Sequence, residues 1–232
     1  MATFKKVSHS YIIKQALVAF RNMVRNYDAK VYNEDWFAIV DACLGHEAGI
    51  RLVEDFFNPK VLDLMKKARA SAERLDFSKP LKDVFFVLWN GGLREECKPM
   101  LHALCNIRIR AIGKVDRDDV DKKRLSTIIK SFGLSKFEGE ILTVAYAEKK
   151  GYIAWPCLQF PSEQPELYAM ALNRSMEEVA GALRADGLLR QYGLLDEHFE
   201  FNDKDFGDFM NGTDSDFGKK HRAMLALMAH NG

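Results

Sequence analysis

The segment Gly133-Leu134-Ser135-Lys136-Phe137-Glu138 carries the clearest structural signal in this sequence. Gly133 can adopt the left-handed conformation that ends a helix. Ser135 can then accept a hydrogen bond from the free amides of the next helix, while Glu138 reaches back to the amide of Ser135, which is a capping box. Apolar residues follow at helical spacing. The segment therefore predicts the end of one helix and the start of another.

A second capping box is predicted at Ser175-Met176-Glu177-Glu178-Val179, at the start of a helix over 176–186. Gly187 is placed to end that helix. Further along, Phe199 and Phe201 alternate with polar residues, as in a half-buried strand. A capped helix followed by a short hairpin is typical of winged helix-turn-helix domains. An ordinary helical bundle with a short non-helical hook fits the same pattern.

Helical patterns also fill the first half of the chain. Apolar residues step by four and three over residues 9–27, Asn33 precedes a helix that is apolar nearly all round, and Leu81 to Trp89 is a short apolar helix. Pro99 is predicted to start a helix over 100–112, because proline is favoured at the first helical position. These patterns indicate a fold class that is all-α or helix-dominated.

The stretch from Lys114 to Arg124 is dense in charge of both signs and poor in apolar residues. It predicts a charged linker over 114–121, although a solvated helix start fits equally well. We therefore expect an N-terminal helical bundle over 1–113 and a winged-helix-like subdomain over 122–232, with at most a short β-hairpin.

Composition limits the class of protein. Of 232 residues, 47% are hydrophobic and 16 are Phe, which argues against disorder. The formal net charge of +1 gives no general attraction to nucleic acid. No apolar run reaches the length of a membrane span, the N-terminus lacks a secretory signal, and the four cysteines are scattered as reduced thiols would be. We expect a cytoplasmic protein that does not enter a membrane.

The sequence contains no recognisable catalytic motif. There is no phosphate-binding loop of the Gly-x-x-x-x-Gly-Lys-Ser/Thr type. His102 and Cys105 would lie one turn apart, but Cys97 falls outside their predicted helix and a fourth zinc ligand is not evident. We therefore expect neither an enzyme nor a bound metal or cofactor.

The segment from Tyr152 to Pro165 combines three prolines with large apolar residues. It either covers the core as an irregular arm or offers Trp155, Leu158 or Phe160 to a partner. We expect at least one of these three side chains to be exposed, beside the second capped helix. With Arg184 they form the candidate interaction surface.

DNA binding is the activity that a winged helix suggests, but the residues disfavour it. Glu177 and Glu178 lie at the N-terminal end of the helix that would read the major groove, and Arg184 is the only basic residue of that helix. Contacts to phosphates and bases depend mainly on basic and amide side chains.

The C-terminal half resembles a region of a known family. The pattern Gly133-Leu134-Ser135, Glu138 and Ile141-Leu142, followed by residues 188–195 and Phe209-Met210-Asn211-Gly212, is similar to the helical, winged-helix-like region that precedes the motor in some bacterial AAA-type ATPases. The resemblance implies a regulatory or substrate-recruiting part without its motor, so no catalytic residue is carried over. The leading hypothesis is a non-enzymatic protein-interaction or adaptor module, whose partner is such a motor or its substrate. The alternative is a winged-helix DNA-binding transcriptional regulator.

Overall fold

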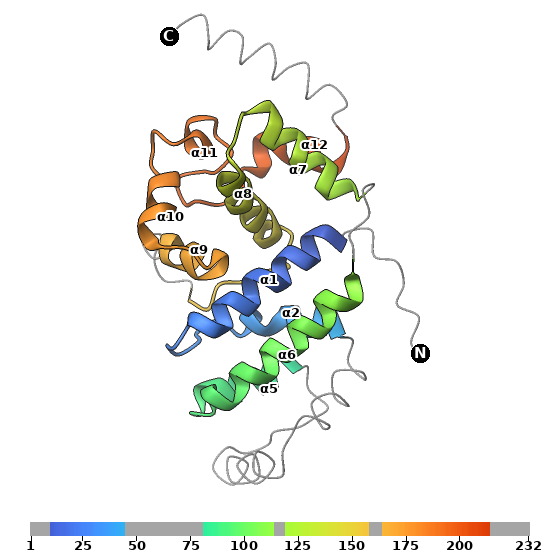
Figure 1. The fold of residues 1–232 in the computed structure, drawn as a ribbon, viewed down its shortest axis with the longest axis vertical. Helices are drawn as coiled ribbons and strands as arrows, with labels where there is room; N and C mark the ends of the chain where they lie inside the picture. Colours follow the sequence, from blue (N-terminus) through green and yellow to red (C-terminus); the bar gives the residue numbers. More distant parts are fainter. Residues whose placement is uncertain (1–9, 45–80, 114–118, 158–163, 214–232) are drawn as a thin grey trace, which may run out of the picture.

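The computed structural model describes residues 10–44, 81–113, 119–157 and 164–213 (Figure 1). This part of the chain is helix-dominated, as predicted, and contains no strand longer than an isolated bridge. Its helices are α1 Ser10–Asn26, the 3-10 helix η1 Glu34–Phe37, α2 Ala38–Leu44, α5 Leu81–Asn90, α6 Arg94–Ile112, α7 Val120–Ser131, α8 Lys136–Lys149, α9 Gln164–Leu172, α10 Met176–Ala182, α11 Leu188–Gln191 and α12 Asp203–Asn211.

Helix α1 is shared by the two halves of the structure. It crosses the middle of Figure 1, with α6 on one side and α8 and α9 on the other, and it contacts all three. The apolar residues predicted to form one stripe over 9–27 face the core, where Ile12, Leu17 and Phe20 are almost completely buried. A helix that is apolar over so wide a stripe can cover two neighbours at once. The described buried side chains consequently form one continuous core.

An aromatic cluster fills the N-terminal half. The ring of Trp36 lies 5.4 Å from that of Phe20 and 5.1 Å from that of Trp89, both edge to face. The indole N–H of Trp89 donates to the carbonyl of Ala29 at 3.0 Å, so its polar end is satisfied inside the core. As predicted, Asn33 is an N-cap: its side chain accepts from the amide of Asp35 at the start of η1, the 3-10 helix that contains Trp36.

The predicted start of α6 was wrong. The helix begins at Arg94, and Pro99 lies inside it instead of opening it. Pro99 cannot donate to the carbonyl one turn earlier, but it lies on the exposed face, where water can hydrate that carbonyl. Glu95 and Glu96 occupy the first turn, where acidic groups favour the positive end of a helix.

Both predicted capping boxes are present. The hydroxyl of Ser135 accepts from the amide of Glu138 at 3.2 Å, and the Glu138 carboxylate accepts from the amide of Ser135 at 2.8 Å. Ser175 and Glu178 form the same pair of bonds at 3.2 and 3.1 Å. Gly133 has a φ of +62°, as a left-handed helix end requires.

The helix after the second capping box is shorter than predicted. α10 ends at Ala182, so the predicted extension to residue 186 was wrong. Gly187 has a φ of −73° and precedes α11 as its N-cap, instead of ending α10. A Cβ at Gly187 would come within 2.8 Å of the carbonyl oxygen of Ala182, so glycine is needed for this close approach.

The predicted hairpin is reduced to one antiparallel bridge, between Leu195 and Phe201. The amide of Asp196 donates to the carbonyl of Glu200 at 3.0 Å, and that of Asn202 donates to Leu194 at 3.1 Å. In this hook, residues 194–202, the side chains of Leu194, Leu195 and Phe201 are buried. The winged-helix character of residues 122–232 stays a prediction.

The predicted linker contains two buried acidic residues, while residues 114–118 lie outside the described part. The Asp119 carboxylate accepts from the hydroxyl of Ser10 and the amide of Tyr11 on α1, both at 3.0 Å, and caps α7. Asp121 accepts from the Tyr146 hydroxyl at 3.3 Å. The division at 114–121 stays a prediction, but Asp119 holds the start of α7 to α1.

Candidate functional site

An open groove lies between α1, α8 and the end of α9, with a volume of about 710 Å³. Small buried residues from these three helices contribute to its lining, namely Ala19, Gly139 and Ala171. A Cβ at Gly139 would come within 2.8 Å of the Ile129 side chain on α7, so glycine at this position lets α8 pack closely against α7. Ile129 itself also lines the groove.

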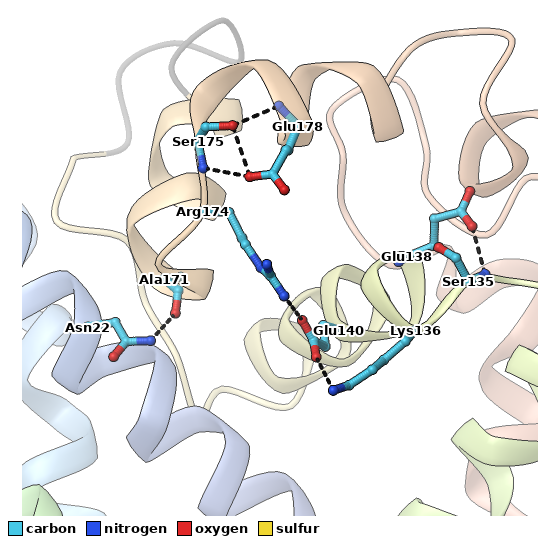
Figure 2. Close-up of polar contacts among 9 residues, drawn as sticks. All are labelled: Asn22, Ser135, Lys136, Glu138, Glu140, Ala171, Arg174, Ser175 and Glu178. Carbon is cyan, nitrogen blue, oxygen red and sulfur yellow. Dashed lines mark hydrogen bonds and ion pairs between the residues drawn. The ribbon is translucent and has the colours of Figure 1, made fainter.

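Amide and hydroxyl groups also line the groove. The Asn22 side chain donates to the carbonyl of Ala171 at 2.9 Å, which satisfies one of the last carbonyls of α9 and ties that helix to α1 (Figure 2). The side-chain amide of Gln15, on the same helix, makes no hydrogen bond to a described residue. Burial raises the pKa of Tyr11, so its phenol stays neutral and keeps its proton. The lining of the groove thus combines hydrogen-bonding groups with apolar residues.

Three charged residues form the rim of the groove, and Figure 2 shows them together. The guanidinium of Arg174 is 3.7 Å from one carboxylate oxygen of Glu140, and the ammonium of Lys136 is 3.9 Å from the other. Both distances exceed that of a normal hydrogen bond. Glu140 therefore holds its two cationic partners loosely.

The backbone around Arg174 is fixed on both sides. The amide of Arg174 donates to Ala169 at 2.9 Å and that of Asn173 donates to Met170 at 3.2 Å, which is the Schellman pattern at the end of α9. Asn173 has the positive φ, +52°, that this ending requires. The next residue, Ser175, already caps α10. The side chain of Arg174 lies over the ring of Phe137, with its guanidinium carbon 5.5 Å from the centroid.

The residues predicted as an interaction surface do not line this groove. Trp155 is only 2% exposed, and its ring packs 5.2 Å from that of Tyr168, so Trp155 is not an exposed anchor and the prediction of at least one exposed side chain depends on Leu158 and Phe160. The side chain of Asn33 donates to the carbonyl of Trp155 at 3.0 Å, which holds this irregular segment against the N-terminal half. An apolar side chain of this size is more stable inside the core than in water.

The other predicted surface residues give no shared site. Leu158 and Phe160 lie outside the described residues, so the prediction for them is untested. Arg184 is exposed, and its guanidinium donates to both carboxylate oxygens of Asp186 at 3.1 and 3.2 Å. The guanidinium of Arg184 is thus paired with Asp186, two residues further along the chain and beyond the end of α10.

The cysteines of α6 are buried thiols. Burial raises the pKa of Cys97 to about 12, so this thiol is protonated and unreactive at neutral pH. His102 is exposed and hydrogen-bonds the side chain of Asn106 at 3.0 Å. In the described part of the chain, no group of three His, Cys, Asp or Glu side chains is placed to hold a metal ion. Among the helices that the structure describes, none is long and apolar enough to cross a membrane.

The groove was not predicted from the sequence. Its residues come from α1, α7, α8 and the end of α9, and no local motif links Gln15 on α1 with Gly139 on α8 or Ala171 on α9. The one available signal was Arg174, a basic residue directly before a capping box.

Comparison with protein-family models, with curated proteins and with solved structures gives no match to this chain. The groove is therefore interpreted from its own chemistry.

Proposed function

We propose that this protein is a non-enzymatic interaction module, an adaptor that holds an extended segment of a partner protein in the groove between α1, α8 and α9. The observation that carries the proposal is the groove itself, an open groove of about 710 Å³ lined by small apolar residues and by amide side chains. An extended peptide has unpaired backbone N–H and C=O groups along its length. The Gln15 and Asn22 side chains can serve both kinds of group.

Hydrogen bonds hold the helices around the groove in place, which favours binding without a large rearrangement. Asn22 joins α1 to the end of α9, and the capping box at Ser135 fixes the start of α8. A preformed groove lowers the entropy cost of ordering the site when a ligand binds. These features support a binding role for the groove.

The resemblance to AAA-type ATPases supports a motor of that class, or its substrate, as the partner. The chain would then regulate the motor or recruit its substrates. An ATPase motor encoded directly beside this chain, and its association with the purified protein, would test this part of the proposal.

DNA binding receives less support. Glu177 and Glu178 are exposed at the start of α10, and the Arg184 guanidinium is engaged by Asp186. We expect only weak binding to duplex DNA through α10 even at low salt, because its exposed start carries two carboxylates and the Arg184 guanidinium beyond its end is already paired. Electrophoretic shifts at submicromolar protein that weaken with salt and with Arg184→Ala would favour the regulator instead.

The direct experiment is selection of displayed random peptides on the purified protein. Gln15→Trp adds a large side chain to the wall of the groove at a position with no described side-chain hydrogen bond to lose. Ala111→Trp adds the same side chain at an exposed position of α6 outside the groove. Selected peptides should bind wild type and Ala111→Trp equally and lose binding to Gln15→Trp. Equal binding to all three proteins would contradict the proposal.

A further inference from the structure

We infer that the groove selects partner segments that carry an acidic side chain, and that Arg174 is the residue that receives it. The inference rests on the proposed function and specifies the ligand of the same site. It depends on three observations: how Arg174 is held, which carboxylates surround it, and what lies next to it.

The guanidinium of Arg174 is held in place by its surroundings but makes few interactions of its own. The Schellman ending of α9 and the capping box of α10 fix its backbone, and the ring of Phe137 supports its side chain. Its side chain is 42% exposed, and its guanidinium makes no hydrogen bond of normal length to a described residue. A planar guanidinium with free N–H groups matches the two oxygens of a carboxylate. Its stacking reduces the entropy lost when that carboxylate binds.

The neighbouring carboxylates do not take up the hydrogen-bonding groups of Arg174. Glu138 accepts from the amide of Ser135, and Glu178 accepts from the amide and hydroxyl of Ser175, so both serve their own helix ends. Glu140 lies 3.9 Å from Lys136 and 3.7 Å from Arg174, the two cations of the rim. The hydrogen bonds from Ser175 and, to a smaller extent, the charge of Arg174 lower the pKa of Glu178. Neither Glu140 nor Glu178 makes a hydrogen bond of normal length to Arg174, so its N–H groups are left for another carboxylate.

The amides beside this charge indicate a peptide carrying the acid. The groove that Arg174 borders is also lined by Gln15 and Asn22, side chains that suit a peptide backbone. A peptide with one Asp or Glu uses both features at once, with its backbone in the groove and its carboxylate on Arg174.

Peptide selection with a charge-altered rim tests this inference. Selection on the wild-type protein should enrich Asp or Glu at one position. Arg174→Gln should weaken binding of those peptides roughly tenfold, because a charge-assisted bond at a partly exposed site is lost, and repeated selection on this variant should show no acidic preference. Arg190→Gln is the matched control, since Arg190 also lies over a ring, that of Phe199, at 5.3 Å and outside the groove. It should leave affinity and preference unchanged.

The outcomes separate the two proposals. Enrichment of Lys or Arg, or an acidic preference that survives Arg174→Gln, would overturn the role of Arg174. A different outcome is that the selected peptides lose binding to Gln15→Trp and yet show no acidic preference. That result would support the interaction function and overturn this inference. Failure to select any groove-dependent peptide would overturn both.

Discussion

Replacing Asp119 with alanine should destabilise the fold by about 2–4 kcal/mol. The residue is 6% exposed, and its carboxylate accepts three hydrogen bonds of 3.0 Å, from Lys122 at the start of α7 and from Ser10 and Tyr11 at the start of α1. Loss of a helix N-cap typically costs about 1 kcal/mol. Each further donor that loses a charged acceptor adds roughly 1 kcal/mol when it is only partly buried.

Denaturant unfolding gives the free energy, and hydrogen exchange shows where the structure loosens. Because Asp119 bonds both helices, the amides at the starts of α1 and α7 should lose protection together. Asp119→Asn keeps an oxygen acceptor without the charge, so it should recover roughly half of the loss.

Asp186→Ala is the control, because Asp186 is exposed and bonded to the exposed Arg184. Surface pairs of this kind contribute little, so the change should stay within about 0.5 kcal/mol. The reasoning would be refuted if Asp119→Ala cost no more than this control, or if α7 loosened while α1 kept its protection.

Three further predictions concern stability. Trp155→Ala should cost about 3–5 kcal/mol in denaturant unfolding, because it empties a buried aromatic site, whereas Arg184→Ala should cost less than about 0.5 kcal/mol; equal costs would contradict the burial of Trp155. Ser135→Ala and Ser175→Ala should each cost about 1 kcal/mol through loss of a capping box, and an unchanged thermal midpoint in either variant would count against its cap. Burial, followed by repulsion from Glu200, raises the pKa of Glu148 from 4.5 to about 7, so the native state holds this proton over a pH range in which the unfolded chain has lost it. The free energy of unfolding should therefore fall as the pH rises from about 4.5 to 7 and then level off. Glu148→Gln should remove that slope and be more stable than wild type at pH 8; a slope that persists in the variant would assign it to another group.

Local signals in the sequence were reliable where the deciding contacts are also local. Each capping box joins residues three apart, so Ser135 and Ser175 could be assigned without knowledge of the fold. The left-handed turn at Gly133 was predicted for the same reason. The start of α6 was missed because Pro99 is tolerated inside the helix on its exposed face, which depends on how α6 packs.

Tertiary contacts decided the remaining differences. Residues 152–157 around Trp155 form no helix, as predicted, whereas Pro165 lies in the first turn of α9. Whether the Trp155 ring faces solvent or Tyr168 depends on the placement of α9. Gly187 occurs where helix-ending glycines occur, yet the structure uses it for a close approach to Ala182. The groove is lined by residues from α1, α7, α8 and the end of α9, and no motif in the sequence indicates that these residues come together.

The location of a bound peptide tests the proposed groove most directly. A peptide selected on the wild-type protein can carry a spin label at one end, and the broadening of backbone amide signals then reports which residues lie near it. We expect broadening along α1, α8 and the end of α9, including Ala19, Gly139 and Ala171, and none in Gln15→Trp. Broadening centred on α10 and the hook between Leu195 and Phe201, with the groove signals unchanged, would contradict the proposed function.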